Sequence, residues 1–203
     1  MNLFSRSSEN RFNPKLVWAL VIFTVIYRVI ASQIPALSNS SPTMALCFGG
    51  GLLLGRKFWW IPAAMILGSD FLIGLRNGGG GIGTYTLLTI ALFCGAAWVG
   101  NRSSRWNGRT WPTMWCGVLV SSVIFYAAAN TFVWLAYPGY AKTLAGWWQS
   151  QTVGLPQYSP QSWVFLRNAL IGDSAWCLIA GALFFFKGER ASAVKASAPL
   201  SHS

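Results

Sequence analysis

Charged side chains are scarce in this chain. They make up 9% of its 203 residues, whereas a soluble globular domain carries about 25% Asp, Glu, Lys and Arg. Hydrophobic residues reach 54%, so too little polar surface remains to cover a particle that faces water on all sides. We therefore expect lipid to cover much of the molecule, and the length suits one membrane domain.

Residues for common catalytic and metal sites are equally few. The single histidine, His202, lies in a polar tail, and the four cysteines stand singly inside apolar runs without metal-ligand spacing. No Ser/His/Asp or Cys/His set can be assembled from these residues. The Gly78–Gly81 run lacks the Lys-Ser/Thr pair that completes a phosphate-binding loop. We expect no enzyme, no cofactor, no metal site and no nucleotide hydrolysis by the chain itself.

Apolar runs divide the sequence into six candidate spanning helices. They cover about 16–32, 42–55, 58–75, 83–99, 113–136 and 164–186. The first run could be a signal peptide, but its length favours an uncleaved helix. We therefore predict an all-α six-helix membrane bundle over 16–186, with a cytoplasmic segment over 1–15 and a disordered cytoplasmic tail over 187–203.

Basic residues fix the expected orientation of this bundle. With six crossings and a cytoplasmic start, 11 of the 15 Lys and Arg lie on the inner side, and the outer side keeps only Arg28, Arg76, Lys142 and Arg167. If the short second run did not cross, the inner side would hold only 6 of 15. The positive-inside rule thus favours six helices in a bacterial inner membrane, with both termini cytoplasmic. Because the charges lie in short links, we expect no nucleic-acid partner.

A seventh, shorter helix is expected between the fifth and sixth spans. Residues 142–155 are too polar and too few to cross, but Leu144, Trp147, Trp148, Gln151 and Leu155 fall near one helical face. This pattern is typical of an amphipathic helix at the membrane interface. The helix could be an aromatic anchor or a lid over an outward-facing pocket.

Two of the four acidic residues lie inside predicted spans. Asp70 is twelve residues into its helix, about 18 Å from the inner edge and roughly 12 Å from the outer face. Asp173 enters from the outer side and lies about 13 Å deep, so the two carboxylates share a depth. A charge in lipid costs at least about 2.5–3.5 kcal/mol. We therefore expect both carboxylates to face a wet cavity or a partner.

An outward-opening polar pocket satisfies this requirement. In this hypothesis the two aspartates form its floor, Arg28 and Arg167 lie near its mouth, and Asn130 lines it between the aromatic walls of Tyr126 and Trp134. The alternative is structural, with each aspartate paired to an arginine to hold the bundle. The Gly51-x-x-x-Gly55 pattern is more typical of close helix packing than of a site.

Several short motifs resemble a family of uncharacterised bacterial six-helix membrane proteins. They are Asn39-Ser-Ser-Pro42, Ser69-Asp70, Asn130-x-x-Val133-Trp134-Leu135 and Arg167-Asn168-Ala-Leu-Ile-Gly172-Asp173. That family resembles the substrate-binding S components of energy-coupling-factor transporters. The resemblance implies an S-component-like six-helix fold and small-molecule capture from outside, with a coupling membrane subunit and ATPases as partners. It also implies that Asn39, Asp70, Asn130, Arg167, Asn168 and Asp173 belong to the family pattern.

We expect a membrane transport protein, a substrate-binding subunit with an unidentified small-molecule ligand in its outer half. One alternative is a self-sufficient secondary carrier in which Asp70 and Asp173 relay protons. Another is a structural or assembly protein whose buried charges are only ion pairs.

Overall fold

The computed structural model describes residues 14–34, 37, 39–79, 82–158 and 160–185, and this part of the chain is all α-helical, without a strand. The predicted tail and most of the predicted N-terminal segment lie outside these ranges. The helices are α1 (Pro14–Ala31), α2 (Thr43–Leu54), α3 (Ile61–Arg76), α4 (Thr84–Trp106), α5 (Trp111–Ala136), α6 (Leu144–Gln151) and α7 (Ser162–Ala180). A 3-10 turn, Gly55–Phe58, follows α2, and a π-helical turn, Gly181–Phe185, extends α7.

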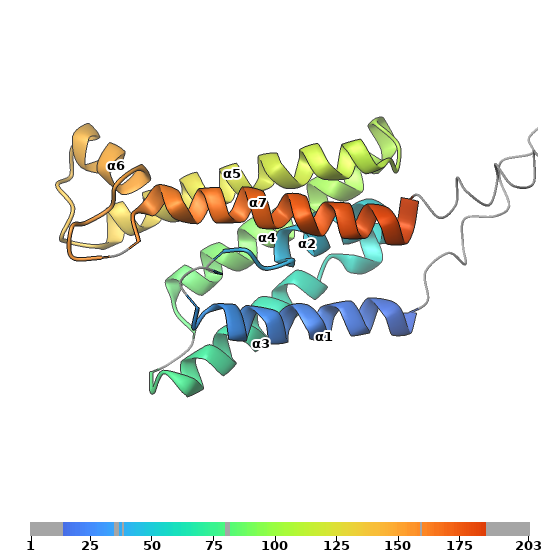
Figure 1. Ribbon diagram of the computed structural model, residues 1–203, viewed down its shortest axis with the longest axis horizontal. Helices are drawn as coiled ribbons and strands as arrows, with labels where there is room; N and C mark the ends of the chain where they lie inside the picture. Colours follow the sequence, from blue (N-terminus) through green and yellow to red (C-terminus); the bar gives the residue numbers. More distant parts are fainter. Residues whose placement is uncertain (1–13, 35–36, 38, 80–81, 159, 186–203) are drawn as a thin grey trace, which may run out of the picture.

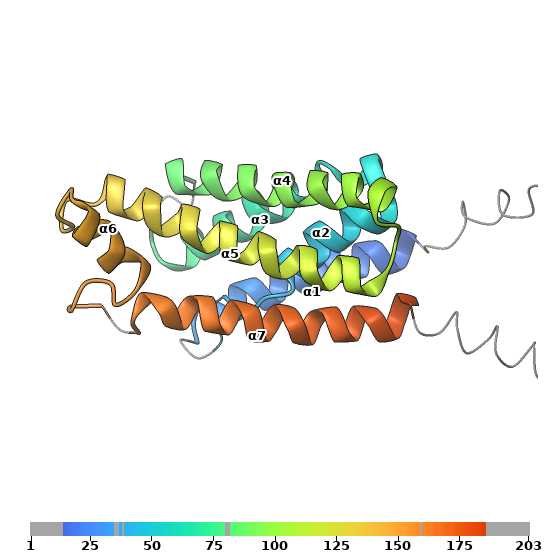
Figure 2. The ribbon, with the colours of Figure 1, turned by 90° about the horizontal axis from the view of Figure 1, so that it is seen from above.

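The long helices run back and forth between two ends of an elongated bundle (Figure 1). The end of α1, the end of α3, the start of α4 and α6 lie at one end, which we call the α6 end. The start of α1, the 55–60 link, the 107–110 link and the end of α7 lie at the opposite end (Figure 2). The six predicted spans therefore correspond to six antiparallel helices, and the predicted short helix is α6.

The middle of the bundle is built around α2. This helix has no charged residue and nine of its twelve residues are buried, as expected of a helix surrounded by protein. It packs most closely on α4: a Cβ added at Gly51 would lie 2.0 Å from the Ala97 carbonyl oxygen, and one at Gly100 would lie 2.3 Å from that of Phe48. Gly51 thus serves close packing, whereas Gly55 ends α2 with a φ of +69°.

The outside of the bundle is apolar. Large apolar side chains with more than half of their surface exposed lie on α1, α3, α4, α5 and α7, for example Ile22, Phe71, Leu87, Ile124 and Ile171. Two of the described helices, α4 and α5, are long and apolar enough to cross a membrane, while the apolar stretches Val17–Ala31 and Thr43–Leu54 are shorter. The six-crossing arrangement stays a prediction.

One predicted boundary is wrong by almost two turns. The apolar pattern ends near Val99, but α4 continues through a polar stretch to Trp106. The Arg102 guanidinium lies 5.1 Å from the centre of the Trp106 ring, one turn further on. The helix ends only where Gly108 adopts a φ of +74°, so local turn chemistry sets this end.

Candidate functional site

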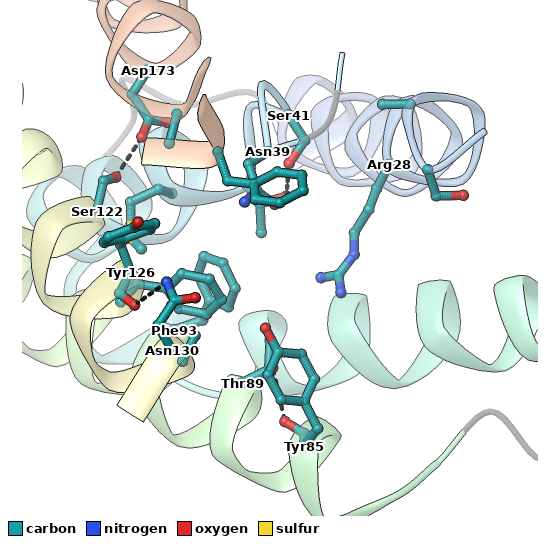
Figure 3. A pocket seen from close by; sticks show the side chains of 18 of the residues that line it. Arg28, Asn39, Ser41, Tyr85, Thr89, Phe93, Ser122, Tyr126, Asn130 and Asp173 are labelled. Carbon is teal, nitrogen blue, oxygen red and sulfur yellow. Dashed lines mark hydrogen bonds between the residues drawn. The ribbon is translucent and has the colours of Figure 1, made fainter. Parts of the chain in front are cut away.

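A cavity of about 450 Å³ lies in the half of the bundle nearer the α6 end. It exists because α2 begins only at Thr43, near mid-bundle, so that the 39–42 segment replaces what would otherwise be further turns of helix. Its wall comes from α1, α3, α4, α5, α7 and the start of α2. The lining is mixed, with phenylalanine rings beside hydroxyl, amide, guanidinium and carboxyl groups (Figure 3).

Arg28, on the last turn of α1, is oriented by an ion pair with Asp70. Its Nη2 donates to Asp70 Oδ1 on α3 at 2.7 Å, and the other carboxylate oxygen of Asp70 accepts from the Thr86 hydroxyl on α4 at 2.8 Å. Arg28 lines the cavity and points into it, while Asp70 is not among the lining residues. The carboxylate therefore joins three helices and orients the guanidinium.

Asp173, on α7, forms part of the opposite side of the cavity. This residue is only 3% exposed, and its Oδ2 accepts a hydrogen bond from the Ser122 hydroxyl on α5. Arg28–Asp70 is the ion pair present among the described residues, so Asp173 has no cation bridged to it in this part of the chain. Figure 3 shows Arg28 and Asp173 on different sides of the cavity.

The 39–42 segment is fixed by contacts with α1 and α7. Tyr27 and Ser40 share a hydroxyl hydrogen bond of 3.1 Å, and the Trp176 indole N–H donates to the Ser40 carbonyl at 2.8 Å. Gly172 makes this possible, since a Cβ there would lie 2.8 Å from the Ser40 Cα. Asn39 has a φ of +62°, a conformation that asparagine tolerates better than most residues. Asn39 and Gly172, which both belong to the motifs of the sequence, thus determine the backbone path beside the cavity.

Helix α6 lies against the C-terminal turns of α5. The Trp147 indole N–H donates to the Thr131 hydroxyl at 2.9 Å, and the Gln151 amide reaches the same oxygen at 3.2 Å. Tyr126, which lines the cavity, donates its phenol to the Gln151 carbonyl at 2.5 Å. In the link before α6, burial raises the pKa of Tyr140, so this phenol stays protonated at neutral pH.

Of the nine expected binding residues, the cavity brings together five: Arg28, Asn39, Tyr126, Asn130 and Asp173. Asp70 contacts Arg28 but does not line the cavity. The Trp134 indole instead donates to the Ala141 carbonyl at 2.9 Å. Arg167 is exposed, with its guanidinium 5.4 Å from the Trp163 ring centre and 3.2 Å from Asn168 Oδ1. The expected gathering of both aspartates on one floor does not form.

Several lining residues were not expected from the sequence. Tyr85, Thr89 and Phe93 come from α4, Ser122 and Phe125 come from α5, and Phe165 comes from α7. An uncharged residue inside an apolar helix can face lipid, the core or a cavity at little energetic cost. The sequence therefore does not distinguish these lining residues from core residues. Ser122 is the exception, since a hydroxyl level with an acidic residue on another span is a candidate partner.

Among the described residues, no group of three His, Cys, Asp or Glu side chains could hold a metal ion. The cavity offers donors, acceptors and rings to a small organic molecule, and its volume falls in the range of ligand pockets.

Comparison with known proteins identifies a family. No curated protein and no solved structure matches the chain significantly. A model described as a family of unknown function (DUF6580) matches residues 8–194, which include every helix described above. The chain belongs to this family of unknown function.

Proposed function

We propose that the protein is a multi-pass membrane protein with six crossings that captures a small molecule from the outer face, as the substrate-binding subunit of a transporter. The resemblance to S components of energy-coupling-factor transporters supplies the expected partners, a coupling membrane subunit and ATPases. The proposed location is the bacterial cytoplasmic membrane, with both termini on the inner side.

The apolar exterior supports the membrane assignment. Exposed Ile, Leu and Phe side chains lie on α1, α3, α4, α5 and α7, and together they form an apolar surface too large to be left in water. Tryptophans gather at both ends: Trp59 and Trp106 at the opposite end, and Trp148 and Trp163 at the α6 end. Such aromatic belts mark the two membrane interfaces.

The orientation follows from the basic residues. The link after α2 contains Arg56, and the region where α4 meets α5 contains Arg102, Arg105 and Arg109, all at the opposite end. The α6 end carries fewer basic residues. This distribution supports an outer position for the α6 end, and for the cavity with it, by the positive-inside rule.

The cavity is the observation that carries the proposed function. A purely structural protein has no need for a 450 Å³ space with a guanidinium and a buried carboxyl group on its walls. Within the membrane an ionisable group is costly unless it has a partner, and Asp173 has no ionic partner among the described residues. The cavity's position under α6 also matches capture from outside.

The test is to purify the tagged protein from gently solubilised native membranes and record native mass spectra. We expect a complex with one small molecule per chain, together with a membrane subunit and ATPases in the same preparation. A chain that carries neither ligand nor partner, and that binds nothing from a native small-molecule extract, would refute the proposal.

A proton-coupled carrier is the second candidate, and the buried Asp173 favours it. An acidic group that is 3% exposed and lacks a bridged cation in the described part is suited to bind and release a proton. Liposomes that contain only this protein separate the two candidates. Uptake of the purified ligand that an uncoupler blocks would favour the carrier over the binding subunit.

A further inference from the structure

We infer that the ligand is a small organic cation, a flat ring compound with a protonated nitrogen that binds beside Asp173. The inference rests on the proposed function and deepens it by naming the ligand class.

Charge balance on the cavity walls is the first step. Arg28 and Asp173 are the charged residues among those that line the cavity. Arg28 is already neutralised by Asp70 at 2.7 Å, and the second oxygen of Asp70 is taken by Thr86 at 2.8 Å. The Asp173 carboxylate has only the Ser122 hydroxyl as a partner among the described residues. The cavity wall therefore holds one carboxyl group that has no ionic partner among the described residues.

A bound cation is the partner that suits this carboxyl group best. A carboxylate held away from water is stabilised by an opposite charge in hydrogen-bond contact. Ser122 occupies Oδ2 of Asp173, and Oδ1 has no partner among the described residues. An ammonium or protonated ring nitrogen at Oδ1 would complete the pair. An anionic ligand would instead add like charge beside Asp173.

The aromatic wall favours a flat ring on the same molecule. Phe93 and Phe125 both line the cavity, with ring centroids 5.0 Å apart and planes tilted by 35°. Tyr126 stands beside them (Figure 3). Aromatic faces attract both apolar rings and organic cations.

Arg28 adds one polar requirement. Only its Nη2 donates to Asp70, and its other N–H groups have no partner among the described residues. Because its charge is already balanced, these groups suit a neutral acceptor, such as a carbonyl or hydroxyl oxygen of the ligand.

The experiment releases the compound bound to the purified full-length protein and measures its mass and its retention on a cation exchanger at neutral pH. We expect a retained, cationic compound. As a defined probe, 4-(aminomethyl)benzamide should raise the melting temperature, while its neutral analogue 4-methylbenzamide should not.

Two variants complete the design. Asp173→Asn keeps the size of the side chain and a carbonyl acceptor for Ser122, and should weaken binding of the released compound about 10- to 150-fold. Arg76→Gln removes an exposed charge at the α6 end, outside the cavity wall, and should leave the affinity unchanged.

A released compound that is neutral or anionic would overturn the inference and leave the proposed function standing. If nothing is released and no compound of a native extract binds, the proposed function itself fails. The charge of the wild-type ligand decides the question even if Asp173→Asn does not fold.

Discussion

Neutralising Arg28 and Asp70, first singly and then together, separates the structural role of this pair from its role at the cavity. Breaking a fully buried ion pair from one side costs about 3–5 kcal/mol, because the remaining charge is left without a partner. Here the side chains keep 23% and 13% of their surface exposed, so we expect about 2–3 kcal/mol for Arg28→Gln or Asp70→Asn. For a chain of this length that corresponds to a melting temperature lower by about 4–12 °C.

The double variant Arg28→Gln/Asp70→Asn removes the charge of both members of the pair, and the two amides can still hydrogen-bond. We expect it to recover to within about 1 kcal/mol of the wild type, or about 2–4 °C, while ligand binding stays weaker than in the wild type because the Arg28 guanidinium is missing from the cavity wall. The assay is thermal unfolding in mild detergent, followed by intrinsic fluorescence, with ligand binding measured on the same samples. If the losses of stability in the two single variants simply add in the double variant, Arg28 and Asp70 are not energetically coupled and the reasoning is refuted. If the double variant binds the ligand normally, the pair has a purely structural role.

Three further predictions concern other contacts. Gly51→Ala should destabilise the bundle by about 2 kcal/mol or more because its Cβ would clash with a backbone oxygen of α4, whereas Gly95→Ala, with open space around it, should be neutral or stabilising in thermal unfolding. Tyr126→Phe removes the hydrogen bond to Gln151, so α6 should become more accessible to protease and hydrogen exchange, with the cleavage pattern elsewhere unchanged. Arg167→Gln should change ligand affinity less than threefold in a binding titration, because this exposed guanidinium lies outside the cavity wall.

The helices were largely predictable from the sequence. Apolar runs bounded by Gly, Pro and basic residues mark six helices, and the Trp-rich, polar 142–155 segment marks α6. The end of α4 was not predictable in this way, because its last two turns are polar and a glycine at 108 decides where it stops.

The cavity was only half predictable. Depth along a helix follows from counting residues, and it singled out Asp70 and Asp173. Rotation of each helix about its axis decides which way a side chain points, and apolar patterns fix it poorly when both lipid and core are apolar. Asp70 illustrates this, because it meets Arg28 from α3 without reaching the cavity. Arg167 differs, because its offset of about 120° from Asp173 around the same helix follows from counting residues.

Because α2 is short and begins near mid-bundle, the size of the cavity depends on the segment that precedes this helix. The close contact between α2 and α4 around Gly51 and Gly100 lies on the side of the cavity away from the α6 end. Changes in the segment before Thr43 therefore do not alter this contact. Lengthening the segment that precedes Thr43 by a helical turn would shrink the cavity, and shortening it would enlarge the cavity, while the α2–α4 contact would stay intact. Relatives with the same scaffold could in this way accept molecules of different size by altering one connecting stretch.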